Sequence, residues 1–195
     1  MKTAEKIFSF LYNVMGWCTW LGVVGILVFM TVLFATGDSR SPDITVDSIA
    51  VSAVTENDPV RSQAGIKNTD GLFRIDYNVH IAGASLSPYS YSVNGIKLKT
   101  FDGGTNVKYV SFAGNGGAEK NVIKYSKLTP ADFTVSVYVQ AAGRSTAEIQ
   151  KLSSSAGFTL TDMQLHFSIF DIDVTSGTPS FYVKDNPDVK ITAAA

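Results

Sequence analysis

The longest uncharged stretch of the chain, Ile7 to Gly37, most constrains what this sequence can fold into. It reads IFSFLYNVMGWCTWLGVVGILVFMTVLFATG, and its densest apolar part runs from Trp17 to Phe34. A bilayer core requires about 20 mostly apolar residues in helical form, because lipid offers the backbone no hydrogen-bond partner. We therefore predict that residues 1–37 are an N-terminal tail and a single transmembrane helix.

The flanks of this segment predict its fate and its orientation. The apolar run is longer than the roughly 7–15 residues of a signal-peptide core, so we expect an uncleaved anchor. Lys2 and Lys6 precede it, whereas Asp38, Arg40 and Asp43 follow it. The positive-inside rule then places the N-terminus in the cytoplasm, matrix or stroma, and the large domain in a periplasmic, lumenal or extracellular space.

The predicted helix carries two groups of candidate functional residues. Trp17 and Trp20 lie about one turn apart and are expected to anchor the helix at the headgroup level. Small side chains, which let membrane helices approach closely, recur at three- and four-residue spacings. The residues of this candidate packing stripe are Gly16, Cys18, Thr19, Gly22 and Gly25. Glycine is also common in membrane helices generally, so a docking stripe and mere composition both remain open.

The remainder of the chain has the size and charge of one ordinary domain. Residues 38–43 form a short polar linker, and residues 44–195 follow as a single domain. The whole chain has 16 basic and 17 acidic residues and a net charge of −1, without charge runs, so nucleic acid is not an expected partner. Cys18 is the one cysteine, which excludes an intrachain disulfide and a cysteine-based metal site.

From Ile44 onward, apolar and polar residues alternate in short segments, which indicates strands. The clearest is Leu72 to Ile81, and an alternation slip near Asp47-Ser48 predicts a bulge in the first strand. Asn94-Gly95 predicts a type I′ hairpin turn that places Val93 opposite Ile96 and Tyr91 opposite Leu98. Further strands are expected at 107–112, 121–125, 133–139, 158–174, 180–183 and 189–191.

Two helical signals interrupt these strands. A capping box at Ser145 to Glu148 predicts a short helix that ends near Leu152. Thr129-Pro130 is typical of a helix start, but a strand follows so soon that only one turn fits. Residues 158–174 form either one bent strand or two strands paired through 171–173. Together the elements predict an antiparallel β-sandwich of immunoglobulin- or fibronectin-like class with one or two short helices.

Candidate catalytic and metal-binding residues are few. No motif places carboxylates beside His80 or His166, so we expect surface or structural histidines. Asp171 and Asp173 share one side of a strand but are too few for a calcium site. The glycine pairs at 103–104 and 116–117 lack the phosphate-binding pattern and are expected to form turns. We expect no catalytic residue, no metal and no cofactor.

Two segments carry a resemblance to a known family. The stretch Ser41-Pro42-Asp-Ile-Thr-Val-Asp-Ser-Ile after a single span, and Leu86-Ser-Pro-Tyr-Ser-Tyr-Ser-Val-Asn-Gly-Ile-Lys-Leu, resemble the plant harpin-induced-like membrane proteins with their group-two late embryogenesis abundant domain. The family's Asn-Pro-Asn signature is missing, since the chain reads Ile81-Ala-Gly-Ala-Ser at that place. The resemblance implies a β-sandwich and a non-enzymatic, membrane-tethered interaction domain.

Three functional hypotheses follow from the sequence. The first is a structural or accessory subunit of a larger membrane complex, whose helix packs on other integral subunits and whose β-sandwich packs on an extramembrane protein surface. The second is a free-standing, membrane-tethered protein of the stress or defence type. The third is a membrane-anchored enzyme or binding domain. Expected contact surfaces are the edge near Lys97 and Lys99 and the loops around Arg61 and Asn115.

Overall fold

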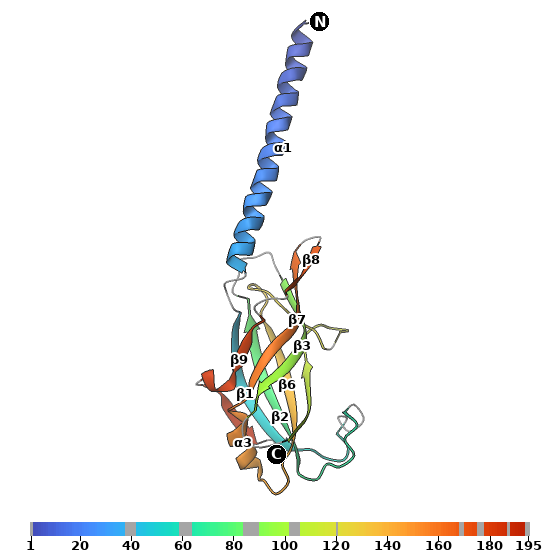
Figure 1. Cartoon of the computed structure of the whole chain (residues 1–195), viewed down its shortest axis with the longest axis vertical. Coiled ribbons are helices and arrows are strands. Elements are labelled where there is room, and N and C mark those ends of the chain that lie inside the picture. The colour runs from blue at the N-terminus through green and yellow to red at the C-terminus, as the bar shows by residue number, and fades with distance from the viewer. Residues whose placement is uncertain are drawn as a thin grey trace. The chain divides into compact units, whose positions relative to one another are not determined.

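The computed structural model describes residues 2–37, 42–58, 64–83, 90–101, 106–119, 121–167, 170–174, 178–186 and 188–193. The chain divides into two compact units, Met1–Arg40 and Ser41–Ala195. Many of their helices and strands are labelled in Figure 1. Arg61 lies outside the described residues.

The first unit is a single helix, α1 (Lys2–Gly37), of 36 residues. At 1.5 Å per residue it is about 54 Å long, which exceeds the roughly 30 Å thickness of a bilayer core. Within it, the segment Glu5–Phe29 is long and apolar enough to cross a membrane, and none of that segment is buried within the protein. The prediction of a helix able to span a membrane is therefore confirmed, while its orientation stays a prediction.

The second unit contains two sheets. The first sheet has the strand order β10–β1–β2–β6–β4, with the bounds β10 (Lys190–Ala193), β1 (Asp43–Ala53), β2 (Leu72–Ala82), β6 (Ala131–Gln140) and β4 (Asn106–Ala113). The second has the order β5–β3–β7–β8, and β9 also pairs with β7; the bounds are β5 (Ile123–Tyr125), β3 (Ser90–Thr100), β7 (Gly157–Phe167), β8 (Phe170–Val174) and β9 (Ser180–Tyr182). The helix α3 (Thr146–Ser153) joins the sheets, and a short 3₁₀ turn, η1 (Val183–Asp185), follows β9.

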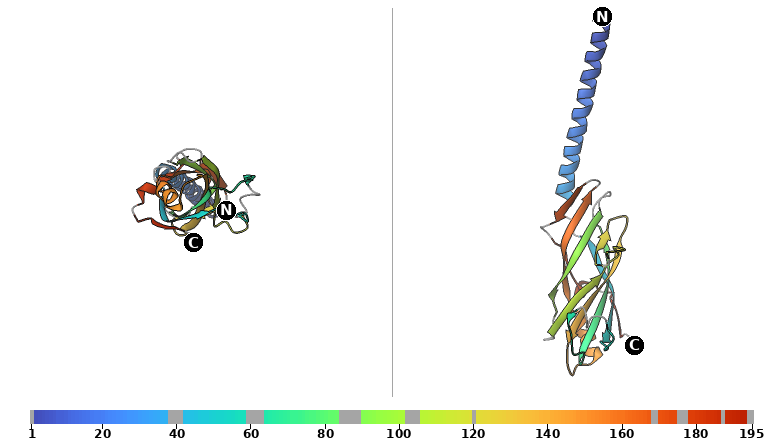
Figure 2. Two further views of the ribbon diagram at one scale, coloured as in Figure 1. Left: turned by 90° about the horizontal axis from the view of Figure 1, so that it is seen from below. Right: turned by 90° about the vertical axis from the view of Figure 1, so that its right-hand side faces the viewer.

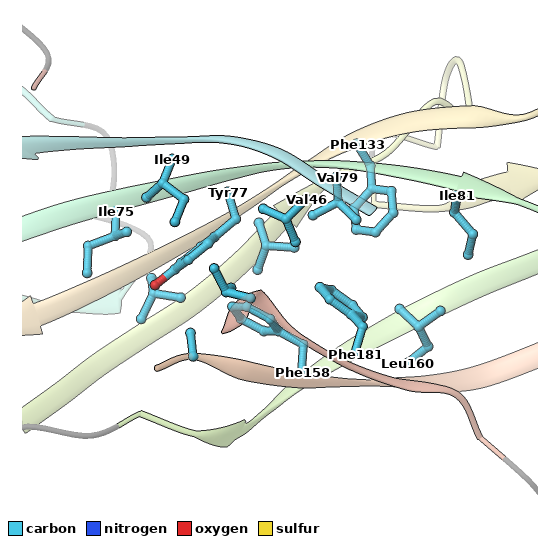
Figure 3. Close-up of a cluster of buried hydrophobic side chains, with 14 of the residues drawn as sticks. Val46, Ile49, Ile75, Tyr77, Val79, Ile81, Phe133, Phe158, Leu160 and Phe181 are labelled. Carbon is cyan, nitrogen blue, oxygen red and sulfur yellow. The ribbon is translucent and has the colours of Figure 1, made fainter. Parts of the chain in front are cut away.

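The two sheets face each other across one hydrophobic core. In the end-on view of Figure 2 the strands surround a single interior. Figure 3 shows side chains of both sheets meeting there, among them Tyr77 and Val79 from β2 and Phe158 and Phe181 from β7 and β9. The Tyr77 and Phe158 rings meet edge to face with their centroids 5.1 Å apart, and both side chains are fully buried. Such aromatic pairs stabilise a core by about 1 kcal/mol beyond their area.

Local sequence patterns place several elements correctly. Along β2, Phe73, Ile75, Tyr77, Val79 and Ile81 are buried, as the alternation predicted. The pairing of β1 with β2 shifts register between Val46 and Ser48, which confirms the predicted bulge. The predicted capping box is also present at the start of α3, where the Ser145 hydroxyl accepts from the backbone N–H of Glu148.

The prediction of wholly antiparallel sheets is wrong at one pair. Strand β10 runs parallel to β1, with Ser48 opposite Lys190 and Val51 opposite Ala193. All other strand pairs of the described residues are antiparallel. A parallel neighbour requires a long crossover connection. Here most of the domain lies between the two strands, so no short-range signal announces the pair.

The predicted Asn94-Gly95 hairpin is also wrong. Both residues lie inside β3, which pairs with β7 along almost its whole length. Among the described residues, positive φ angles occur at Asp162 and at four glycines, but not at Asn94 or Gly95. A Cβ on Gly95 would lie 2.2 Å from the Thr161 hydroxyl oxygen. The glycine therefore makes room for a neighbouring strand rather than for a turn.

One smaller prediction is corrected as well. No helix starts at Thr129-Pro130, because Ser126 and Thr129 close a hydrogen-bonded turn that leads directly into β6. For the segment 158–174 the structure decides between the two predicted alternatives. It forms two antiparallel strands, β7 and β8, which pair through residues 171–173, with Asp171 opposite His166 and Asp173 opposite Gln164.

Candidate functional site

The predicted packing residues of α1 divide between different faces of the helix. With about 100° of rotation per residue, Cys18, Gly22 and Gly25 fall within roughly 60° of one another, whereas Gly16 lies about 180° from Gly25. A Cβ built on Gly16, Gly22 or Gly25 would meet nothing within 4 Å. The chain's own packing therefore does not require these glycines. We call Cys18, Gly22 and Gly25 the small face of α1.

Of the remaining candidates of α1, Thr19 borders the small face at about 60° from Gly22, and the two tryptophans lie on the far side of the helix. Thr19 donates its hydroxyl hydrogen to the Met15 carbonyl at 2.8 Å, which satisfies that polar group inside the helix. Trp17 and Trp20 are 67% and 64% exposed and lie about 140° and 160° from Gly22 around the helix axis. They line a shallow hollow with Tyr12, Asn13 and Gly16. The helix thus presents an aromatic side opposite its small face.

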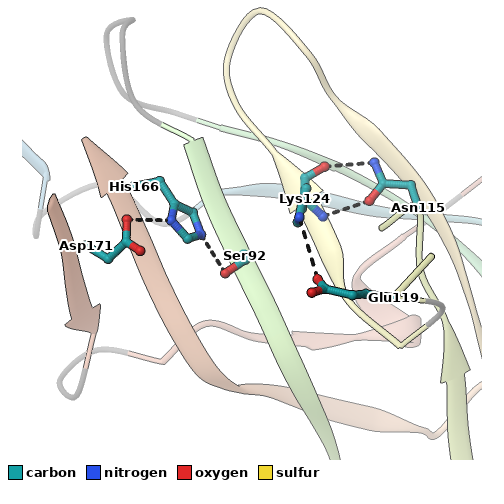
Figure 4. A network of polar contacts seen from close by, with 6 residues as sticks. All are labelled: Ser92, Asn115, Glu119, Lys124, His166 and Asp171. Atoms are coloured by element: carbon teal, nitrogen blue, oxygen red, sulfur yellow. Dashed lines mark hydrogen bonds and ion pairs between the residues drawn. The ribbon is translucent and has the colours of Figure 1, made fainter. Parts of the chain in front are cut away.

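The second unit holds a three-residue polar network on the outer side of its second sheet (Figure 4). His166 of β7 lies between Asp171 of β8 and Ser92 of β3. Its Nδ1 atom is 2.7 Å from the Asp171 carboxylate, and its Nε2 atom is 2.8 Å from the Ser92 hydroxyl. The β7–β8 register places His166 directly opposite Asp171, so strand pairing alone brings these side chains together.

The bonding order of this network is that of a serine–histidine–aspartate nucleophile, base and orienting acid. The surroundings of this network differ from those of a catalytic serine–histidine–aspartate centre. Ser92 is only 3% exposed. It is also flanked by ladder partners on both sides, Lys124 of β5 and Gln164 of β7. Acyl transfer requires an accessible hydroxyl with free backbone donors beside it. What the network does in this structure is tie three adjacent strands together.

A second histidine–aspartate pair lies on the first sheet. The Nδ1 atom of His80 on β2 is 2.7 Å from the carboxylate of Asp132 on β6, and the two residues are direct cross-strand partners. No sequence motif places a carboxylate beside either histidine, whereas the strand register places one beside each. The described residues contain no group of three or more histidine, cysteine, aspartate or glutamate side chains that could hold a metal ion.

Two residues that the sequence singled out make contacts within the domain. Asn115 accepts from the Lys124 backbone N–H at 2.7 Å and donates to its carbonyl at 2.8 Å, so its side chain extends the sheet like an extra strand residue. Lys124 also approaches Glu119 at 3.6 Å (Figure 4). Asp173 accepts from Gln164 at 3.1 Å. These bonds fix the loop after β4 and the β7–β8 pair.

A partly buried polar group also occurs on the outer side of the first sheet. Arg74 Nε donates to Asp76 at 2.8 Å, and the Ser136 hydroxyl donates to the same carboxylate oxygen at 2.5 Å. Burial lowers the pKa of Arg74, but the hydrogen bond and the charge of Asp76 raise it, and the net pKa lies above its ordinary value. This group joins β2 to β6.

Sequence reasoning named Lys97 and Lys99 but missed two residues that the fold brings beside Lys99. Tyr182 of β9 and Lys184 of η1 are more than 80 positions along the chain, yet the Lys99 and Lys184 ammonium groups lie 5.4 and 5.2 Å from the centroid of the Tyr182 ring. Tyr182 and Lys184 stand two positions apart in the sequence, but only the β7–β9 pairing reveals that they lie beside Lys99.

No protein-family model, no curated protein and no solved structure matches this chain.

Proposed function

We propose that the chain is a non-enzymatic, single-pass membrane protein that acts as a structural or accessory subunit of a larger membrane complex. The observation that carries this proposal is the small face of α1. Cys18, Gly22 and Gly25 lie together on a segment that is long and apolar enough to cross a membrane, and a side chain at either glycine would meet nothing in this chain. Close packing against a second membrane helix is the use to which such a face is suited.

The polar groups of the β domain support a non-catalytic role. Ser92, His166 and Asp171 bond to one another across three strands, and His80 bonds to Asp132 across two. Each of these groups is used to hold strands together, and the hydroxyl of Ser92 lies in a buried residue. We therefore assign the outer surfaces of the sheets to protein contacts rather than to substrate binding.

The finer class of the fold belongs to the same proposal. We infer an immunoglobulin- or fibronectin-like sandwich, supported by two sheets around one core, with the parallel β1–β10 pair as its departure from antiparallel pairing. The resemblance to harpin-induced-like proteins is kept as a proposal of kinship. We further propose that the N-terminus is cytoplasmic, or in matrix or stroma, and that the β domain lies on the opposite side of the membrane.

Purification of the full chain from its native membrane in a mild detergent tests the proposed function. We expect it to resist an alkaline carbonate wash and then to migrate on a native gel well above its own mass of 20.9 kDa, together with partner subunits identified by mass spectrometry. Replacing both small-face glycines, Gly22→Leu with Gly25→Leu, should release those partners.

Gly16→Leu is the matched control, because it adds the same side chain to the same helix on another face. It should leave the complex intact. A wild-type chain that migrates alone would contradict the proposal and favour a free-standing tether. Equal release by the Gly16 and Gly22/Gly25 variants would refute the role of the small face.

A further inference from the structure

The outer side of the second sheet carries a cluster of lysines around one tyrosine. We call Lys97, Lys99, Lys184 and Tyr182 the basic face. Lys97 is exposed on β3 opposite Thr159 of β7. Lys99 follows two residues later, where the β3–β7 register shifts between Leu98 and Thr100. Bulges of this kind redirect a side chain. Here the ammonium group of Lys99 lies over the ring of Tyr182.

The position of the Tyr182 ring is fixed by a glycine across the strand pair. Gly157 is the direct partner of Tyr182, and a Cβ on Gly157 would lie 2.5 Å from the Cδ1 atom of the ring. The Tyr182 ring therefore occupies the space that a side chain at position 157 would need. Lys184 approaches the same ring from η1, at 5.2 Å from the centroid. The fold thus brings two ammonium groups to one aromatic side chain.

These lysines have no carboxylate partner among the residues that the structure describes. The salt bridges found there, within 4.0 Å, involve Arg74, His80, Lys124 and His166, and none involves the basic face. Asp185 is adjacent to Lys184 in sequence but makes no ion pair with it. Cation–π contacts at exposed sites contribute only about 0.5–1 kcal/mol each, so the charges remain available to an external anion.

The basic face lies away from the end of the β domain at which the linker enters. The linker enters at Asp43, which pairs with Ala82 at the end of β2. The next residue, Gly83, bonds to Ser126 beside β5, and Tyr125 of β5 pairs with Tyr91 of β3. Tyr91 therefore marks the end of the domain where the linker enters. At about 3.3 Å per strand residue, Lys97 and Lys99 lie roughly 20–26 Å further along β3.

We propose that the basic face docks an acidic segment of a partner protein. An extended segment with Asp or Glu at alternate positions repeats its carboxylates about every 7 Å, which is also roughly the spacing of the Lys97 and Lys99 backbone positions along β3. The paired hydroxyls of Thr159 and Ser180, 2.9 Å apart, lie beside Lys97 and offer a further hydrogen-bond donor. This inference names the surface and the partner chemistry of the proposed function and rests on it.

The test uses the purified full chain in detergent micelles and a fluorescein-labelled dodecapeptide of alternating Glu and Ser. We expect saturable binding by fluorescence anisotropy that weakens as salt rises, because exposed charges are screened. Lys97→Glu with Lys99→Glu should weaken binding at least tenfold. The matched control, Lys108→Glu with Lys151→Glu, makes the same charge change on exposed lysines of β4 and α3 and should change it less than twofold. Tyr182→Leu should have an intermediate effect, because Lys99 and Lys184 lose their shared ring.

Three outcomes would overturn the inference. The first is a wild-type chain that does not bind the peptide. The second is an equal loss of binding in the Lys97/Lys99→Glu and Lys108/Lys151→Glu variants, which would mean that binding depends on net charge alone. The third is binding of phosphatidylserine vesicles through Lys97 and Lys99 by a chain that does not bind the peptide. Lys97→Arg with Lys99→Arg keeps both positive charges and should retain binding, which shows that these two positions tolerate substitution when the charge is kept. Because the assay needs no native complex, failure here and co-migration of partners on the native gel would reject the basic face and leave the proposed function standing.

Discussion

The hydroxyl of Tyr77 donates a hydrogen bond of 3.1 Å to the carbonyl oxygen of Ser153, the last residue of α3. Tyr77 is fully buried at the centre of β2, and its ring packs on Phe158 of the opposite sheet. One side chain thus connects the first sheet, the second sheet and the helix that joins them. Burial also raises the pKa of Tyr77, because the phenolate form would lose its solvation.

Tyr77→Phe tests this connection. The variant keeps the ring but leaves the Ser153 carbonyl without its donor, so we expect a loss of about 1–2 kcal/mol in the free energy of unfolding at pH 7. A raised pKa in the folded state gives a stabilisation that is complete below the unfolded value, about 10, and is lost as pH rises above it. Removing the phenol should therefore flatten the alkaline loss of stability. Denaturant melts of the β domain at pH 7 to 11 measure both effects, and parallel pH curves for the two proteins would contradict the second.

Two glycines with nearly equal positive φ angles should respond differently to replacement by alanine. Gly65 and Gly71 have φ angles of 65° and 67°, but a Cβ on Gly71 would lie 2.7 Å from the Cα of Ala142, whereas one on Gly65 would meet nothing within 4 Å. Gly65→Ala then carries only the cost of the left-handed conformation, about 1–2 kcal/mol. Gly71→Ala adds a backbone clash of a further roughly 1–3 kcal/mol. In thermal melts the Gly71→Ala variant should therefore unfold at a lower temperature than the Gly65→Ala variant. The reverse order would refute the close approach of Gly71 to Ala142.

The capping box of α3 predicts a pH dependence in the acid range. The Ser145 backbone N–H and then its hydroxyl hold the pKa of Glu148 below its ordinary value. A lowered pKa gives a stabilisation that is present above the unfolded value, about 4.3, and is lost as pH falls through the folded value. Glu148→Gln should therefore flatten the fall in stability below about pH 5. Ser145→Ala should lower stability by about 1 kcal/mol at neutral pH, because the helix loses its N-cap. Identical acid curves for the wild type and Glu148→Gln would count against the box.

The Ser92–His166–Asp171 network predicts a structural rather than a chemical role. We expect the full chain to remain unmodified by a fluorophosphonate probe, as seen by intact mass. Ser92→Ala should lower the free energy of unfolding by about 1 kcal/mol, because His166 loses one of its two partners. His166→Asn should have an effect of similar size. Covalent labelling at Ser92 that disappears in the His166 variant would instead establish an activated serine.

The features that were predicted correctly are those determined by residues close together in the sequence. The alternation in β2, the bulge after Val46 and the capping box at Ser145 each depend on neighbours within a few residues. The apolar segment of α1 is equally local, because length and composition alone decide whether a helix is able to cross lipid.

The errors arose where distant residues decide the outcome. Asn94-Gly95 has the composition of a turn, but pairing with β7 over the length of β3 outweighs that preference. The partners of His80 and His166 depend on the register between strands, which local sequence patterns do not determine. Lys184 joins Lys99 only because β9 adds to the edge of β7.

The parallel β1–β10 pair also has a consequence for how the domain assembles. The backbone N–H of Val46 is bonded to the side chain of Asn186, 140 positions later, and β10 then covers the outer edge of β1. Until that distant segment arrives, the first strand of the β domain exposes a row of unsatisfied peptide groups, a template to which any extended chain can add. Closing so long a loop is slow, so a nascent β domain keeps this open edge, and the risk of aggregation that goes with it, until its last strand is in place.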